Sequence, residues 1–73
     1  MKSSYEAVSG KDFSKLLEQN GWTLRRVAGS HHIFTKDGSA VRLSVPIHGN
    51  RPLKIGLQKH LANLAGLTDK DFE

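Results

Sequence analysis

The sequence predicts an α+β fold in the order helix, three antiparallel strands, helix, with both helices packed on one face of the sheet. That order rests on apolar periodicity and on turn residues. Apolar residues recur at helical spacing near each end of the chain and alternate with polar residues in between. Turns that contain glycine or proline separate the strand-like runs. Two amphipathic helices bury their apolar surfaces best on the same sheet face, which leaves the other face open to solvent.

Length and composition predict a single small domain. Seventy-three residues lie near the lower limit at which one hydrophobic core suffices. We expect one domain over residues 1–73, with its core within 9–67 and loose segments at 1–8 and 68–73. The absence of cysteine excludes disulfides and thiolate metal sites and suits a reducing cytoplasm. We expect a cytoplasmic protein, because no apolar run approaches the roughly 18 residues of a membrane span and no signal-peptide core begins the chain.

The charge of the chain is basic and unevenly distributed. Eleven Lys and Arg against seven Asp and Glu give a formal net charge of +4. The last six residues are acidic, so the remainder of the chain is more basic than this total. A basic domain of this kind favours polyanionic partners, of which nucleic acid is the commonest. The same modest excess also fits a solvated surface that keeps a small protein in solution.

The first helix is predicted over residues 10–20. Ser9 and Asp12 have the spacing of an N-terminal capping pair, with Asp in place of the usual Glu. Gly21 is a typical C-terminal stop, and we expect Trp22 to fold back over the helix end into the core. The apolar stripe of this helix is Phe13, Leu16 and Leu17.

The three strands are predicted over residues 22–28, 31–36 and 41–45. Alternation puts Trp22 and Leu24 on one face of the first strand and Thr23, Arg25 and Val27 on the other. Gly29-Ser30 predicts a tight turn before the second strand. Asp37-Gly38 predicts a two-residue hairpin, and Pro46 ends the third strand.

The second helix follows a polar loop. Asn50 can cap it, or Arg51-Pro52 can open it, because proline is favoured in the first helical turn. Gly66 closes it, and Gly56 costs about 1 kcal/mol relative to alanine unless it permits close packing on the sheet. The predicted apolar stripe is Leu53, Leu57, Leu61 and Leu64.

His31 and His32 point to opposite faces if the second strand begins there. Phe34 shares a face with His32 and favours that face as the core side, so His31 is expected on the open face and His32 at the rim of the core. A slip of one residue would reverse this assignment. Because the pair diverges and no cysteine is present, we expect no metal ion and no cofactor.

The basic open face suggests chemistry on RNA. RNA can be cleaved without a metal because its 2′-hydroxyl is an internal nucleophile, and an imidazole can act as base or acid near neutral pH. His31 is the candidate for proton transfer, although Gly29-Ser30-His31 can equally be an ordinary turn with a surface histidine, because so short a string is unspecific. His48, ahead of the second helix, is either a phosphate ligand or a plain loop histidine. The candidates for binding RNA are Arg25, Arg26, Lys36, Arg42, His48 and Lys54.

Five short motifs occur in order: Asn20-Gly21-Trp22, Gly29-Ser30-His31-His32-Ile33-Phe34, Asp37-Gly38, Val45-Pro46-Ile47-His48-Gly49-Asn50 and Leu61-Ala62-Asn63-Leu64-Ala65-Gly66-Leu67. Over about residues 12–72 they resemble the HicA family of toxin–antitoxin systems. The resemblance implies a double-stranded-RNA-binding-domain-like fold and an mRNA interferase. It also implies a catalytic role for His31, presented by the Gly29-Ser30 turn, and a HicB-type antitoxin that covers this histidine.

Two other functions remain open from the residues. The same fold can bind duplex RNA by shape without cleaving it, and a basic face can instead serve an acidic protein partner. The chain also departs from many HicA relatives, which read Lys-Gly-Thr-Leu where this sequence has Ile55-Gly56-Leu57. Contacts made by that turn to RNA or antitoxin are therefore expected to differ here.

Overall fold

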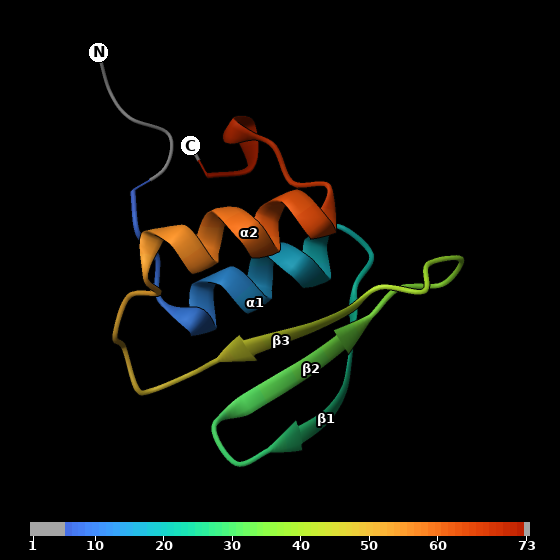
Figure 1. Ribbon diagram of the computed structural model, residues 1–73, viewed down its shortest axis with the longest axis horizontal. Coiled ribbons are helices and arrows are strands. Elements are labelled where there is room, and N and C mark those ends of the chain that lie inside the picture. Colours follow the sequence, from blue (N-terminus) through green and yellow to red (C-terminus); the bar gives the residue numbers. More distant parts are fainter. Residues whose placement is uncertain (1–5, 73) are drawn as a thin grey trace.

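The computed structural model describes residues 6–72 and has the predicted order of elements. Figure 1 shows the two helices side by side over one face of a sheet of three antiparallel strands in the order β1-β2-β3. This confirms the predicted fold class. None of the helices within the described residues has the length and apolar character of a bilayer span. The elements are α1 (Gly10–Gln19), β1 (Thr23–Ala28), β2 (His31–Thr35), β3 (Arg42–Pro46), α2 (Ile55–Ala65) and a short 3-10 helix, η1 (Asp69–Phe72).

The start of α1 is set by its own local sequence. The hydroxyl of Ser9 accepts a hydrogen bond from the backbone N–H of Asp12 at 3.1 Å, which confirms the predicted cap. Asn20 caps the other end, and Gly21 follows with a φ of 91°, a value that glycine adopts without steric cost. The helix therefore begins and ends within a residue of its predicted bounds.

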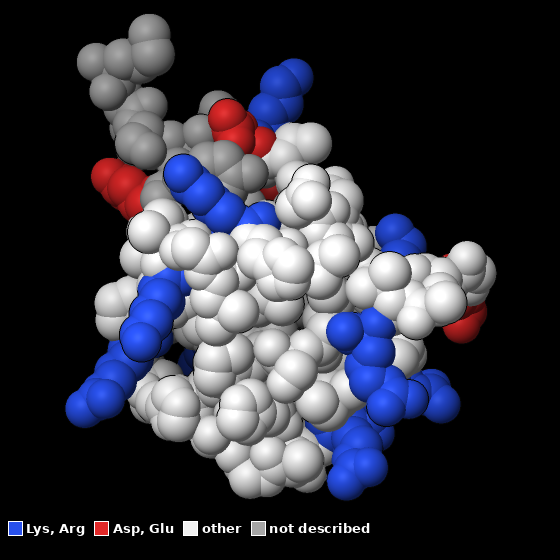
Figure 2. All heavy atoms as spheres, viewed as in Figure 1, with Lys and Arg blue, Asp and Glu red and all other residues white. Residues whose placement is uncertain are grey.

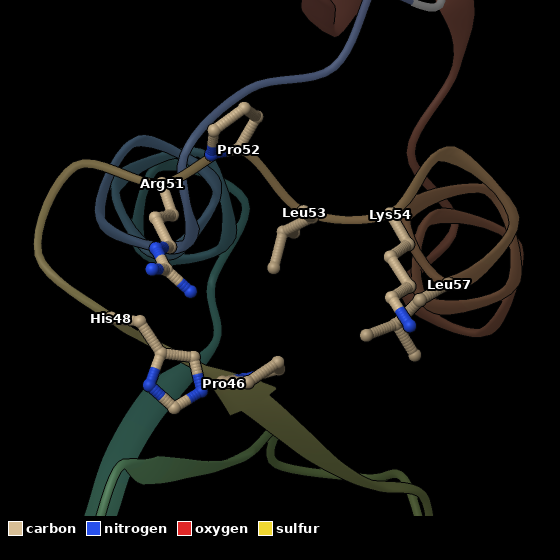
Figure 3. A pocket seen from close by; sticks show the side chains of 7 residues that line it. All are labelled: Pro46, His48, Arg51, Pro52, Leu53, Lys54 and Leu57. Carbon is tan, nitrogen blue, oxygen red and sulfur yellow. The ribbon is translucent and has the colours of Figure 1, made fainter.

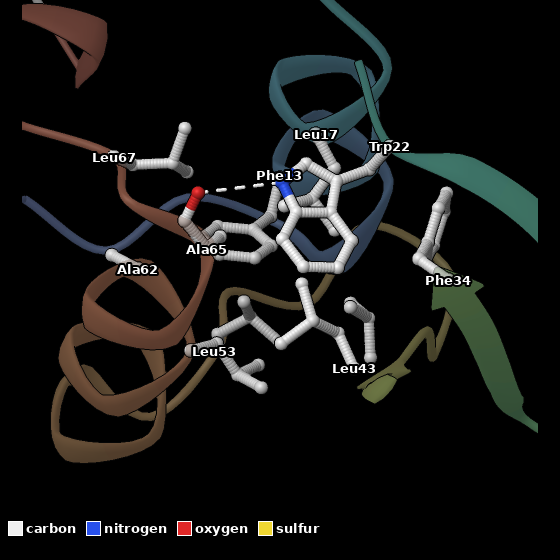
Figure 4. Close-up of a cluster of buried hydrophobic side chains, with 11 residues drawn as sticks. Phe13, Leu17, Trp22, Phe34, Leu43, Leu53, Ala62, Ala65 and Leu67 are labelled. Carbon is white, nitrogen blue, oxygen red and sulfur yellow. Dashed lines mark hydrogen bonds between the residues drawn. The ribbon is translucent and has the colours of Figure 1, made fainter. Parts of the chain in front are cut away.

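The core lies between the two helices and the sheet. Trp22 is buried as predicted, and its indole N–H donates to the carbonyl of Ala65 at the end of α2, over 3.3 Å (Figure 4). This contact joins the end of α1 to the end of α2. The buried apolar residues are Phe13, Leu17, Trp22, Phe34, Leu43, Val45, Leu53, Leu61, Ala62, Ala65 and Leu67.

The connection between β2 and β3 is longer than predicted. The last pair of the ladder is Thr35 with Arg42, so residues 36–41 form the loop. Asp37 and Gly38 do lie in a turn, in which the carbonyl of Lys36 accepts from the N–H of Ser39 at 3.1 Å. The two-residue hairpin is nevertheless wrong, because the strands separate before they reach this turn.

A bulge in β1 changes which residues share a face. The register shifts between Leu24 and Arg26, so Arg25 is an extra residue without a partner on β2. Leu24 lies opposite Phe34 and Val27 lies opposite His32, which puts Leu24 and Val27 on the same, helix-facing side. The predicted placement of Val27 on the other face is wrong, because simple alternation does not continue through a bulge.

The second helix begins later than predicted, at Ile55. The backbone N–H of Leu53 donates to the carbonyl of Val8 at 2.8 Å, and Pro52 forms an isolated bridge with Ser9. These long-range pairings hold residues 52–54 extended, so neither Asn50 nor Arg51-Pro52 opens the helix. Gly66 closes it in the left-handed conformation, as predicted.

The predicted leucine stripe is confirmed in part: Leu53 and Leu61 are buried in the core and Leu57 packs against it. Leu64 is 41% exposed, whereas the polar Gln58 is completely buried. The side-chain carbonyl of Gln58 accepts from the N–H of Val8 at 2.9 Å, and its amide donates to the carbonyl of Glu6 at 3.0 Å. A buried polar group must have hydrogen-bond partners. Gln58 therefore ties the segment before α1 to α2.

Parts of the segments expected to be loose, 1–8 and 68–73, make defined contacts within the described residues. Residues 6–8 are held by Gln58, and Asp69–Phe72 form η1. Phe72 stacks on the buried ring of Phe13 with 6.1 Å between ring centroids. Residues 1–5 and 73 lie outside the described part of the chain.

Replacement of two helical glycines, Gly56 and Gly10, by alanine is expected to change the free energy of unfolding in opposite directions. Gly56→Ala should raise the free energy of unfolding by about 1 kcal/mol, because a Cβ there meets no atom within 4 Å and alanine favours helix. Gly10→Ala should lower it by about 1–3 kcal/mol, because a Cβ there would collide with the carbonyl oxygen of Pro46. Urea unfolding measures both; a stabilising Gly10→Ala would contradict the packing of α1 on the end of β3.

Candidate functional site

His31 is the first residue of β2 and lies on the sheet face that the helices leave uncovered. Its side chain is exposed, while Phe34, three positions later, is 1% exposed and faces the core. The structure thus has the predicted register, with His32 half-buried on the core side opposite Val45. The strand position of His31 directs its imidazole toward solvent.

The turn before His31 is held to β3. Gly29 has a φ of 61°, and the carbonyl of Ser30 accepts from the backbone N–H of Ile47 at 2.8 Å. His31 itself lies between Ala28 of β1 and Pro46 of β3 in the ladder. Strands on both sides therefore restrict the backbone of His31, even though its side chain is exposed.

Arg26 and Ser44 are the polar neighbours of His31 on the open face. Both lie opposite Ile33, which shares its face with His31, so they occupy diagonal positions about 7 Å away. Both are exposed. The bulge at Arg25 is what brings Arg26 to this face, and simple alternation from Leu24 would place it on the core side. A cation and a hydroxyl thus lie on the same face as the imidazole, one on each neighbouring strand.

The remaining predicted RNA ligands do not gather around His31. Arg42 lies opposite Thr35 at the far end of β2, about 13 Å along the strand from His31. Lys36 follows Thr35, and its ammonium lies 5.9 Å from the centroid of the Trp22 ring. Arg25 is exposed at the bulge. In Figure 2 the basic side chains form separate groups with uncharged surface between them, rather than one continuous patch.

His48 and Lys54 both line a pocket, which we call the β3 pocket. It has a volume of about 350 Å³ and lies where β3 ends and α2 begins (Figure 3). Its basic side chains are His48, Arg51 and Lys54, and its apolar lining is Pro46, Pro52, Leu53 and Leu57. In Figure 3 the guanidinium of Arg51 points toward the ring of His48.

Arg51 lines the β3 pocket but is not among the candidate RNA ligands predicted from the sequence. The backbone N–H of Arg51 donates to the carbonyl of His48 at 3.1 Å, which closes a turn through Gly49, whose φ is 58°. This turn returns Arg51 to the same pocket as His48. The His48-Gly49-Asn50 string is a turn signal from which the position of Arg51 in this loop could be predicted, whereas a helix start at Asn50 or at Arg51-Pro52 could not place it there.

The other two histidines lie apart from His31. His60 is exposed on α2, among the helices rather than on the open face. His32 points to the core side of the sheet. Over residues 6–72, His, Asp and Glu side chains do not gather in groups of three or more that could hold a metal ion.

These features define a small basic α+β domain that presents a histidine and an arginine on an uncovered sheet face. A sequence model of the HicA toxin of bacterial toxin–antitoxin systems matches residues 10–67, which is most of the chain. The chain therefore belongs to the HicA toxin family, whose members are known as mRNA interferases, and membership implies an antitoxin partner. A search of curated proteins found no match.

Proposed function

We propose that the chain is an endoribonuclease that cleaves mRNA by means of His31 and without a metal ion. The observation that carries the proposal is the exposed imidazole on a strand paired on both sides, with Arg26 and Ser44 as neighbours on the same face. A rigid backbone under an accessible side chain suits a group that must meet a substrate in one orientation. Family membership supports RNA as the substrate.

The proposed chemistry uses the nucleophile that RNA itself carries. Removal of the 2′-hydroxyl proton lets that oxygen attack the adjacent phosphorus, and the 5′-oxygen then leaves with a proton. His31 transfers one of these protons. Arg26 offsets the negative charge that grows on the phosphate, for which a guanidinium is well suited. Gly29 and Ser30 are positioning residues, because their turn determines where β2 begins and therefore where the His31 side chain lies.

The cations farther away serve binding in this proposal. Arg42 lies opposite Thr35 on the same face as His31, Arg25 is exposed at the bulge, and Lys36 follows the end of β2. Lys36 rests over Trp22, so its contact with RNA competes with that cation–π contact. RNA therefore follows the strands and does not sit on a single basic spot.

We propose further that a HicB-type antitoxin inhibits the protein by covering His31. The open face is not covered by any element of residues 6–72, and the basic side chains along β1 and β3 favour an acidic partner. A partner seated there excludes RNA from the imidazole. One surface then serves both substrate and inhibitor.

The chemistry predicts that cleavage requires the 2′-hydroxyl. The purified protein should cut RNA to a 2′,3′-cyclic phosphate and a 5′-hydroxyl end, and it should leave a 2′-deoxy substrate of the same sequence intact. Chelation by EDTA should not slow the reaction. Gel analysis with end-group mapping checks this. Salt-dependent binding without any cleavage would instead identify a binding module, and loss of activity in EDTA would identify a metal-dependent enzyme.

A further inference from the structure

We infer that the β3 pocket binds one nucleotide of the RNA strand, next to the phosphodiester at His31. Its three basic side chains hold a phosphate, and its apolar lining takes the attached base. This inference rests on the proposed function, because it names a subsite for the same substrate. It adds Arg51 and Leu57 to the residues that contact RNA.

The pocket lies at the end of β3, next to the strand position of His31. Pro46 lines the pocket and is also the residue of β3 that lies directly opposite His31. A strand that presents a phosphodiester to the imidazole can continue past the end of β3, where Pro46 and the start of α2 border the pocket. Pro46 therefore links the pocket to the strand position of His31.

The lining of the pocket combines basic side chains with an apolar surface. His48, Arg51 and Lys54 are basic residues, and none of the seven lining residues is acidic. Prolines and leucines make up the rest, which gives an apolar surface for a nucleobase. The volume of about 350 Å³ is at the lower end for small-ligand sites. That combination of size and polarity fits one nucleotide.

The pocket is held in shape by contacts outside it. Leu53 is 6% exposed and donates its backbone N–H to Val8 at 2.8 Å. Pro52 pairs with Ser9, and the turn from His48 to Arg51 is closed by a backbone hydrogen bond. A preformed pocket loses little conformational entropy when a ligand binds. Its side chains are thus arranged before RNA arrives.

Leu57→Trp tests the apolar part of the pocket. Leu57 is half-buried in the pocket lining, and a larger side chain there fills the space without changing charge. The probe is a short RNA with every 2′-hydroxyl methylated, which cannot be cleaved. We expect its affinity to fall about tenfold, because the indole occupies the space that the base would take. Leu64→Trp is the matched control, because Leu64 lies on the same helix outside the pocket and is 41% exposed.

Removing the two permanent cations tests the phosphate contact. Arg51→Gln with Lys54→Gln should weaken binding of the same probe and lower the slope of log affinity against log salt by about one. Lys15→Gln with Lys70→Gln removes the same charge from exposed positions on α1 and η1 and should leave the slope unchanged. Thermal unfolding of all variants shows that each is folded.

Two outcomes would overturn the inference. In the first, both pocket variants bind the probe as well as their controls. In the second, they keep RNA binding but lose binding of the antitoxin, which would assign the pocket to the protein partner. Failure of the proposed function is distinguishable, because the probe is never cleaved. A wild-type protein that binds the probe in the pocket and cuts no RNA contradicts only the role of His31.

Discussion

His31→Ala is expected to abolish RNA cleavage and the growth arrest that the toxin causes. A single proton-transfer group typically contributes about 10²–10⁴-fold to the rate, so the loss should be at least of that size. The substitution should not disturb folding, because His31 is exposed at the start of β2 and lies outside the hydrophobic core. The rate of cleavage of a labelled RNA and the growth of cells that express the variant measure the effect.

The control for this experiment is His60→Ala. His60 is exposed on α2, in the helix layer. The substitution removes the same imidazole group from a position away from the open face. It should cleave at the wild-type rate. RNA affinity and antitoxin binding of the His31 variant should also stay near wild type. Equal cleavage by both variants would show that His31 is not the catalyst.

Phe13→Ala is expected to have the largest effect on stability. Phe13 is completely buried, belongs to the core cluster and stacks against Phe72 of η1. Truncation of a buried phenylalanine costs about 3–5 kcal/mol. A domain of this size has only a few kcal/mol of stability, so the variant should be largely unfolded at 25 °C. Circular dichroism and urea unfolding measure the loss.

Phe72→Ala is the matched comparison, since it removes the other ring of the same stacked pair. Phe72 is only half-buried, so the loss should be smaller, about 1–2 kcal/mol. The variant should stay folded with a lower midpoint. An equal loss at both positions would mean that η1 is as important to the core as α1. No loss at Phe72 would mean that η1 contributes nothing to stability.

The parts of the fold that depend on neighbouring residues could be predicted from the sequence. Ser9 caps α1 through an N–H only three residues away, and Gly66 closes α2 through its own left-handed conformation. The face of His31 could also be predicted, because the burial of Phe34 orients β2. These features need no information about distant segments.

The parts that depend on distant segments could not be predicted. The late start of α2 follows from the hydrogen bond between Leu53 and Val8, which are far apart in sequence. The burial of Gln58 follows from its bonds to the backbone of the segment before α1. Arg51 lines the β3 pocket for the same reason: residues 52–54 are extended, so Arg51 remains in the loop before α2. Of the proposed site, the sequence indicated both His31 and Arg26 as candidates, but not that the two lie near each other on one face of the sheet.

The bulge in β1 is the clearest case of a missed site feature. One additional residue at Arg25 turns Arg26 to the side of His31. Simple alternation has no means to detect such an insertion, since it counts residues and not hydrogen bonds. The roles of His31, Arg26 and the other candidates stay predictions until the variants are measured.

The bonds of Gln58 and Leu53 to the segment before α1 have a practical consequence for work with this protein. Residues 6–9 form part of the support under the loop that carries Arg51 and Lys54. Affinity tags fused at that end, or proteolytic trimming into it, would alter ligand recognition at a distance while leaving His31 untouched. Placing purification handles at the opposite terminus avoids that artefact.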